Sequence, residues 1–126
     1  MDHESDARAV AERMRREEDE RRRANEARYR HARRDLDALV ACAAGFPGVR
    51  RVLVWGSLLR PDRFCEISDI DICVEGVDDP VEWSRLERAM LETTTFPLDL
   101  VRWEELIEPH RESILARGKV LYESNC

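Results

Sequence analysis

The most restrictive feature of the sequence is a Gly-Ser pair followed, after eleven intervening residues, by two aspartates that a single isoleucine separates. Gly56-Ser57 ends one apolar run, and Asp69 and Asp71 open another. Both runs are rich in β-branched residues, which favours strands. Because side chains alternate between the two faces of a strand, Asp69 and Asp71 are predicted to project from one face, about 7 Å apart.

Two neighbouring carboxylates indicate a cation site. Like charges side by side repel each other unless a cation lies between them. Mg²⁺ prefers oxygen ligands and commonly uses one or two carboxylates together with substrate phosphates. The pair formed by Asp69 and Asp71 therefore predicts a metal platform for phosphate chemistry.

The Gly-Ser pair is suited to binding the phosphate itself. Glycine lets the backbone turn tightly and approach a ligand closely, as we expect for Gly56. Ser57 has two open interpretations: it caps a short helix over 58–61, or it offers its hydroxyl and N–H groups to a phosphate. Arg60 is placed to add a charge-assisted contact to the same anion. Ser68 either caps a turn or assists nucleotide binding.

The Gly-Ser pair and the segment Ser-Asp-Ile-Asp-Ile-Cys-Val at 68–74 together resemble the signature of the polymerase-β-like nucleotidyltransferase superfamily, specifically the minimal nucleotidyltransferases. Proteins of this kind often occur as antitoxins beside all-helical HEPN partners. The resemblance spans roughly residues 47–123. It implies an α+β fold, a polymerase-β-like palm with a small mixed β-sheet and flanking helices, and it assigns a third carboxylate to Asp99.

The resemblance also implies roles for these residues. The catalytic residues, which are also the ligands of two Mg²⁺ ions, are Asp69, Asp71 and Asp99. The residues that bind ATP, the substrate, are Gly56, Ser57, Arg60 and Ser68. The implied reaction moves AMP from ATP to a hydroxyl, expected to be a tyrosine of a HEPN-type toxin that is thereby silenced. Two alternatives stay open: a small-molecule modifier similar to aminoglycoside nucleotidyltransferases, and an antitoxin that neutralises its partner by binding alone.

The first third of the chain predicts one long helix, because no glycine or proline occurs before Gly45. Acid-before-base pairs at i,i+4 spacing, such as Asp19 and Arg23, recur along it and favour a solvated helix. Apolar residues at helical spacing begin only at Tyr29, so the first 25 residues are expected to project from the core. We predict a helix over 1–45, which is a candidate surface for a partner or a second copy, and a nucleotidyltransferase domain over 46–126.

The remaining pattern predicts alternating strands and helices. The expected elements are strands at 50–55, 69–75 and 97–103, a helix at 80–92, a helix at 104–117 interrupted near Pro109, and a short edge strand at 120–122. This order with a mixed sheet is typical of an α+β palm.

Charge and cysteine content exclude several classes of protein. The net charge of −6 arises wholly from residues 38–126, which hold sixteen acids and ten bases, and this argues against nonspecific nucleic-acid binding. The four cysteines, of which Cys126 is the last residue, show neither zinc-site spacing nor a disulfide framework. The longest apolar stretch is too short to cross a bilayer. A reducing cytoplasm is the expected location.

Overall fold

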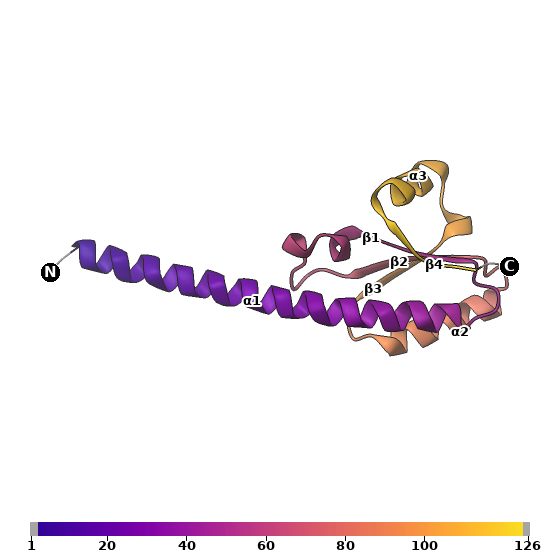
Figure 1. Cartoon of the computed structure of the whole chain (residues 1–126), viewed down its shortest axis with the longest axis horizontal. Helices are drawn as coiled ribbons and strands as arrows, with labels where there is room; N and C mark the ends of the chain where they lie inside the picture. The colour runs from indigo at the N-terminus through magenta and orange to yellow at the C-terminus, as the bar shows by residue number, and fades with distance from the viewer. Residues whose placement is uncertain (1–2, 125–126) are drawn as a thin grey trace.

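The computed structural model describes residues 3–124 and consists of a four-stranded mixed sheet with helices on both faces (Figure 1). The elements along the chain are the helices α1 (His3–Ala44), α2 (Pro80–Thr93) and α3 (Glu108–Arg117), and the strands β1 (Arg51–Trp55), β2 (Ile70–Glu75), β3 (Leu98–Arg102) and β4 (Lys119–Glu123). Three short 3₁₀ turns connect them: η1 (Gly56–Leu59), η2 (Pro61–Arg63) and η3 (Trp103–Glu105). Cys126 lies outside the described residues.

The sheet has the strand order β3-β2-β1-β4. Strand β1 is antiparallel to both of its neighbours, whereas β2 and β3 are parallel. The predicted α+β class, the mixed sheet and the edge position of the last strand are therefore confirmed. The strand boundaries agree with the predictions to within a residue or two, and helix α3 begins directly before Pro109, as expected for a proline in the first turn.

The two faces of the sheet carry different side chains. Helices α1 and α2 cover one face, and α3 lies over the other (Figure 1). Ile70, Ile72 and Val74 of β2 point toward α1 and α2 and are fully or almost fully buried. The opposite face holds a smaller cluster around Leu53 of β1, packed under α3. Because successive residues of β2 alternate between these faces, Asp71 lies on the α3 face.

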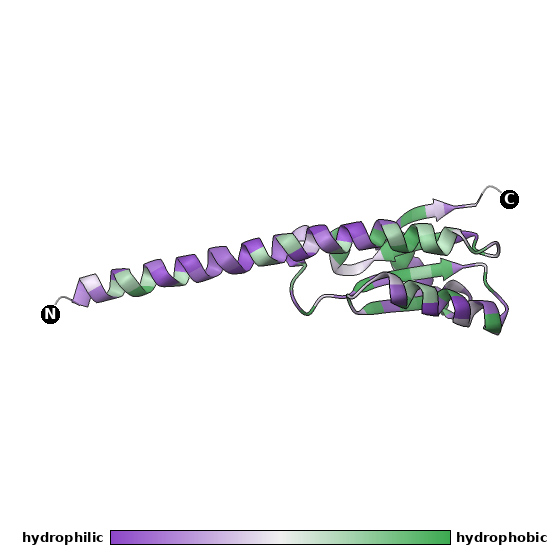
Figure 2. Cartoon of the chain, turned by 90° about the horizontal axis from the view of Figure 1, so that it is seen from below, coloured by the Kyte–Doolittle hydropathy of each residue, from purple (hydrophilic) through white to green (hydrophobic). Residues whose placement is uncertain are grey.

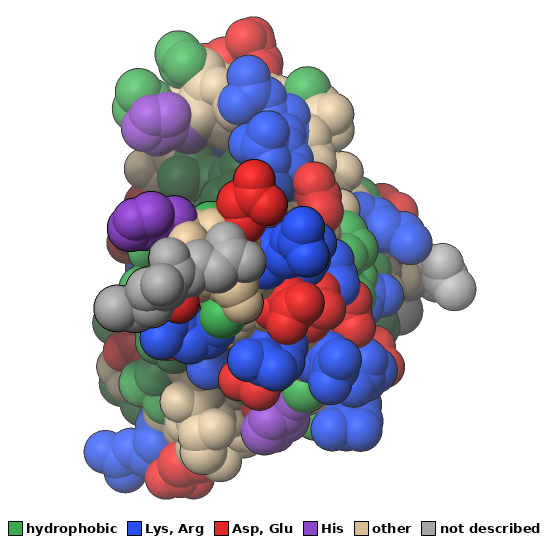
Figure 3. All heavy atoms as spheres, turned by 90° about the vertical axis from the view of Figure 1, so that its left-hand side faces the viewer, with side chains coloured by type: hydrophobic (Ala, Val, Ile, Leu, Met, Phe, Trp, Pro, Cys, Tyr) green, Lys and Arg blue, Asp and Glu red, His purple; other side chains and the backbone are tan. Residues whose placement is uncertain are grey.

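Helix α1 changes character along its length. Its buried residues all lie in its last third, at Ala32, Leu36, Leu39 and Ala43. The N-terminal part extends beyond the sheet and is mostly hydrophilic (Figure 2). Figure 3, viewed toward the N-terminal end, shows acidic and basic side chains intermixed on this face. The predicted projection is confirmed; the division of the chain at residue 45 stays a prediction.

Two local details of the structure differ from the sequence-based predictions. Asp19 forms its ion pair with Arg22, three residues on, rather than with the predicted Arg23. Residues 58–61 form no α-helix capped by Ser57. The 3₁₀ turn η1 begins at Gly56, and its N-cap residue, Trp55, makes no side-chain capping hydrogen bond. The tight turn that glycine permits here takes the place of a capped helix. No helix in the described part of the chain is both long and apolar enough to cross a membrane.

Candidate active site

The register of the sheet brings the predicted acids together. Asp71 is the partner of Trp55 on the antiparallel strand β1 and of Asp99 on the parallel strand β3. The side chains of Trp55, Asp71 and Asp99 therefore lie next to one another on the α3 face of the sheet. Asp69 immediately precedes β2 and lies two residues before Asp71. We call Asp69, Asp71 and Asp99 the carboxylate row.

The row is electrostatically crowded at its centre. The pKa of Asp71 is raised from 3.8 to about 7, mainly by burial and then by the negative charges of Asp69 and Asp99. Hydrogen bonds from Asp71 in its protonated form to the same two neighbours raise the pKa further. Without a nearby cation, Asp71 therefore exchanges a proton near neutral pH, whereas an ordinary aspartate is fully ionised there.

This crowding makes a prediction about stability. Because the folded pKa of Asp71, about 7, exceeds its usual value of 3.8, the folded state binds the proton more tightly than the unfolded chain. Stability is therefore lost as pH rises from about 4 through about 7. Asp71→Asn is expected to raise the free energy of unfolding at pH 8 by about 1 kcal/mol, allowing for solvent screening of this half-exposed group.

Thermal unfolding in EDTA at pH 8 and at pH 4 checks this expectation. The gain in Tm from Asp71→Asn should be a few degrees at pH 8 and should vanish at pH 4. An equal gain at both values would mean that charge repulsion at Asp71 is not its cause.

The donor chemistry of the row fits a hard divalent cation. All three side chains offer carboxylate oxygens, and a cation among them would remove the repulsion that raises the pKa of Asp71. Within residues 3–124, no three His, Cys, Asp or Glu side chains are already arranged as a metal-binding group. Binding of Mg²⁺ in the row, and of two ions in particular, therefore stays a prediction.

Gly56 connects this row to the phosphate loop. Its backbone φ of +84° lies in the left-handed region, where side chains other than that of glycine are strained. A Cβ at this position would overlap Oδ2 of Asp71. The turn after β1 therefore needs glycine for both its conformation and its contact with the carboxylate, and the predicted close approach of Gly56 to a ligand stays a prediction.

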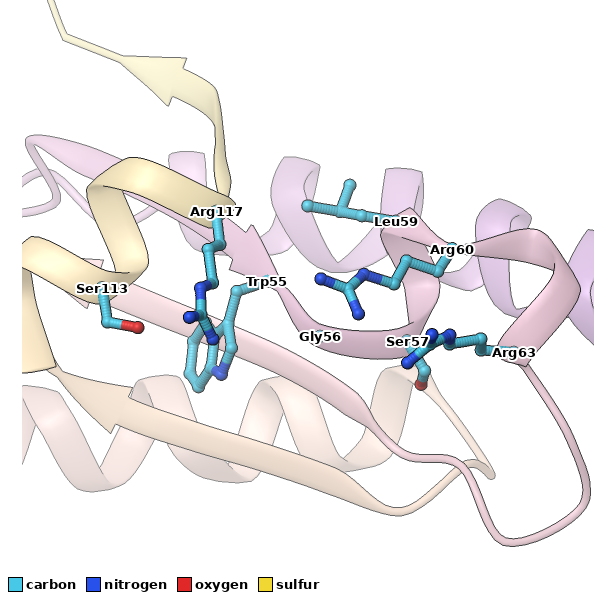
Figure 4. A pocket seen from close by; sticks show the side chains of 8 residues that line it. All are labelled: Trp55, Gly56, Ser57, Leu59, Arg60, Arg63, Ser113 and Arg117. Carbon is cyan, nitrogen blue, oxygen red and sulfur yellow. The ribbon is translucent and has the colours of Figure 1, made fainter.

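A basic cavity of about 370 Å³ opens directly beside this turn (Figure 4). We call it the arginine cavity. Its lining residues are Trp55, Gly56, Ser57, Leu59, Arg60, Arg63, Ser113 and Arg117. Arg60 and Arg117 reach it from different elements, and both lie over the strand end at Gly56 (Figure 4). The lining contains no acid, so a chain of net charge −6 concentrates positive charge next to its carboxylate row.

Two of the cavity arginines were missed from the sequence. Arg63 follows Arg60 by three residues in the next 3₁₀ turn, and that spacing was the available signal. Arg117 ends α3, far from the motif in sequence. The end of α3 approaches β1 closely at Gly118, where a Cβ would lie 2.7 Å from the carbonyl oxygen of Val54. This contact brings Arg117 to the cavity.

Packing of one buried aromatic residue holds the loop that carries Arg60 and Arg63. Phe64 is 1% exposed and makes edge-to-face contacts with Tyr29 of α1 and with Phe96. Helix α1 therefore stabilises the loop that carries Arg60 and Arg63 through the contact between Tyr29 and Phe64.

The structure defines the surroundings of Ser68 and Cys73, and the role of Ser68 in nucleotide binding stays a prediction. The Ser68 hydroxyl accepts a hydrogen bond from the Cys65 N–H at 3.0 Å, which is a turn cap, and Ser68 does not line the arginine cavity. Cys73 is fully buried under α3, and burial raises the pKa of its thiol to about 12. Cys73 is therefore a neutral packing residue.

Sequence comparison identifies the family to which this site belongs. The sequence pattern of the family described as polymerase beta, nucleotidyltransferase matches residues 37–126. The chain belongs to this family. Among curated proteins, no sequence matches this chain closely enough to count as a relative.

Solved structures share the polymerase β nucleotidyltransferase fold. A protein described as a minimal nucleotidyltransferase is 26% identical, with a TM-score of 0.61 over 72% of this chain and 93% of that chain. A toxin–antitoxin structure with AMP-PNP is 20% identical, with a TM-score of 0.56 over 73% of each chain. A variant of the toxin–antitoxin pair MntA–HpeT is 17% identical, with a TM-score of 0.56 over 71% of this chain and 73% of that chain. The fold and the nucleotidyltransferase assignment therefore agree.

Proposed function

We propose that this chain transfers AMP from ATP to a hydroxyl group of a partner protein, and that it acts as the antitoxin of a toxin–antitoxin pair. The observation that carries the proposal is the contact between two unlike sites at Gly56. The carboxylate row lies on one side of this residue and the arginine cavity on the other. A nucleoside triphosphate needs both, because its reacting phosphorus requires metal-binding acids and its leaving pyrophosphate requires positive charge.

The side chains divide the reaction between them. The β- and γ-phosphates bind in the arginine cavity, where Gly56 permits close backbone approach and Arg60, Arg63 and Arg117 supply positive charge. This places the α-phosphate at Asp71. The acceptor oxygen attacks the α-phosphorus opposite the leaving group, the bond from the α-phosphorus to the oxygen that bridges it to the β-phosphate breaks, and pyrophosphate leaves. Asp99, which is exposed, accepts the proton of the acceptor hydroxyl.

Bound Mg²⁺ would be held by Asp69, Asp71 and Asp99 and would supply charge stabilisation at the attacking and leaving oxygens. Asp99 on its own can orient the acceptor hydroxyl by accepting its hydrogen bond. Desolvation of Asp71 strengthens its interaction with any cation in the row.

Two features support a protein as the acceptor. The side chain of Asp99 is exposed, so the surface of another protein can reach the carboxylate row there. Two of the similar folds belong to toxin–antitoxin pairs, one solved with AMP-PNP and one carrying Asp-to-Glu changes two positions apart, which is the spacing of Asp69 and Asp71. An all-helical HEPN-type toxin with an acceptor tyrosine is the partner we propose.

Labelled nucleotide transfer tests the proposal. The chain is co-expressed with a HEPN-type protein, purified, and incubated with Mg²⁺ and ATP labelled at the α-phosphate. Label on a partner tyrosine, absent with Asp69→Ala and Asp71→Ala, is the expected result. Neutralisation of the toxin that survives both changes, with no label, would mean that this antitoxin acts by binding alone. Label on an aminoglycoside but never on protein would favour the small-molecule alternative.

The newly identified arginines make a separate prediction. Arg63→Gln and Arg117→Gln should each weaken binding of inorganic tripolyphosphate by about tenfold, because a charge-assisted hydrogen bond to phosphate contributes about 1.5 kcal/mol. Arg85→Gln is the matched control, since Arg85 is exposed on α2 and lies outside the cavity. Calorimetric titration in EDTA measures the effect without a metal. Equal affinities of all three variants for tripolyphosphate would mean that Arg63 and Arg117 do not bind phosphate.

A further inference from the structure

A second cavity adjoins the arginine cavity and differs from it in chemistry. It has a volume of about 280 Å³, and its lining residues are Trp55, Val101, Leu106, His110, Ser113 and Ile114. Most of these are apolar, and none is an arginine, lysine or acid. We call it the apolar cavity. Trp55 and Ser113 line both cavities, so the two spaces meet at these side chains. They lie at one end of the arginine cavity, with Arg63 at the other (Figure 4).

The apolar cavity also borders the carboxylate row. Trp55 is the register partner of Asp71, and Val101 follows Asp99 by two residues on β3. Side chains two residues apart lie on the same face of a strand, so Val101 is next to Asp99 on the α3 face. The apolar cavity therefore borders the carboxylate row at Trp55 and Val101, beside the proposed position of the α-phosphate.

The three sites adjoin one another, as three groups of one molecule do. A nucleoside triphosphate carries a polyanion at one end, a reacting α-phosphate in the middle and a flat, largely apolar base at the other end. The chain offers a basic cavity, a carboxylate row and an apolar cavity with one indole wall. Aromatic side chains commonly bind nucleobases by stacking.

We propose that the apolar cavity binds the base of the nucleoside triphosphate against Trp55. This inference rests on the proposed function for the position of the phosphates. An aromatic acceptor side chain is the competing occupant, but the geometry disfavours it. In-line transfer needs the acceptor on the side of the α-phosphate opposite the pyrophosphate. The apolar cavity shares the side chains of Trp55 and Ser113 with the proposed pyrophosphate site, so it lies on the pyrophosphate side and not opposite to it.

Two adjacent residues provide a matched pair of variants. Leu106 lines the apolar cavity, whereas Ile107 is 60% exposed and does not. Leu106→Asn places a polar amide in the cavity without changing the charge, and Ile107→Asn makes the same chemical change beside it. Binding of AMP-PNP and of inorganic tripolyphosphate is measured by calorimetry in one magnesium buffer. Tripolyphosphate reports phosphate binding without a base and also shows that each variant is folded.

The unchanged protein is expected to bind AMP-PNP at least tenfold more tightly than tripolyphosphate. Leu106→Asn should remove most of this preference and leave tripolyphosphate affinity unchanged, while Ile107→Asn changes neither. Equal affinity of the unchanged protein for both ligands would overturn the proposal. Unchanged AMP-PNP affinity in Leu106→Asn would also overturn the proposal. If that variant bound AMP-PNP normally but no longer labelled the partner, the apolar cavity would be the site of the acceptor side chain. A retained preference with no transfer to any protein would refute the proposed function and leave the base site standing.

Discussion

Asp71→Asn is expected to lower the rate of AMP transfer by about 10²–10³-fold or more, since electrostatic stabilisation at the reacting group is usually the largest catalytic contribution. Asp71 is the central member of the carboxylate row, with Asp69 and Asp99 as its neighbours, and it contacts the phosphate turn at Gly56. Asparagine keeps the shape of the side chain and removes its charge. Single-turnover rates with labelled ATP and saturating partner protein measure the loss.

Binding separates this catalytic effect from damage to the site. In EDTA, Asp71→Asn should bind ATP at least as tightly as the unchanged protein, because a negative charge beside the arginine cavity has been removed. Asp78→Asn, a change of an exposed acid remote from the row, should alter neither the rate nor the affinity. Full transfer activity in Asp71→Asn would remove the carboxylate row from the mechanism.

Local sequence patterns predicted Asp69 and Asp71 of the carboxylate row, and the resemblance to the nucleotidyltransferases assigned Asp99. Alternation along β2 fixes which face Asp71 occupies, because Ile70 and Ile72 must be buried on the other face. The same alternation in β3 places Asp99 opposite Leu98 and Leu100. Pairing of these strands then brings the acids together with no information beyond the order of strands in an α+β palm.

The cavities could not be predicted in the same way. Arg117 and Leu106 reach the site only because α3 packs over the sheet and Gly118 meets the end of β1. These contacts join segments that are distant in sequence, and no spacing rule encodes them. The raised pKa of Asp71 also depends on burial, which the identity of the residue does not reveal. Sequence therefore predicted the acids, while tertiary packing determined what surrounds them.

Gly56→Ala is expected to remove most of the transfer activity at a modest cost in stability. Alanine at a φ of +84° is strained by about 1–2 kcal/mol. The new Cβ would also overlap Oδ2 of Asp71, and that atom is the end of a side chain able to rotate away. The overlap is therefore relieved by displacing the central carboxylate, and misplacement of a reacting group by about 1 Å lowers rates by about 10²-fold.

Gly48→Ala provides the matched control, because its Cβ would lie 3.4 Å from the carbonyl oxygen of Gly76, an ordinary contact, and its φ is not in the left-handed region. Urea unfolding should show a change below about 0.5 kcal/mol for Gly48→Ala and a loss of about 1–2 kcal/mol for Gly56→Ala. Transfer assays should show full activity in the first variant and nearly none in the second. A fully active Gly56→Ala protein would mean that the turn after β1 does not set the position of Asp71. Displacement of Asp71 lowers the rate of transfer, whereas displacement of the loop lowers the affinity for phosphate. A Gly56→Ala protein with an unchanged transfer rate but weaker tripolyphosphate binding would therefore mean that Gly56 shapes only the phosphate loop.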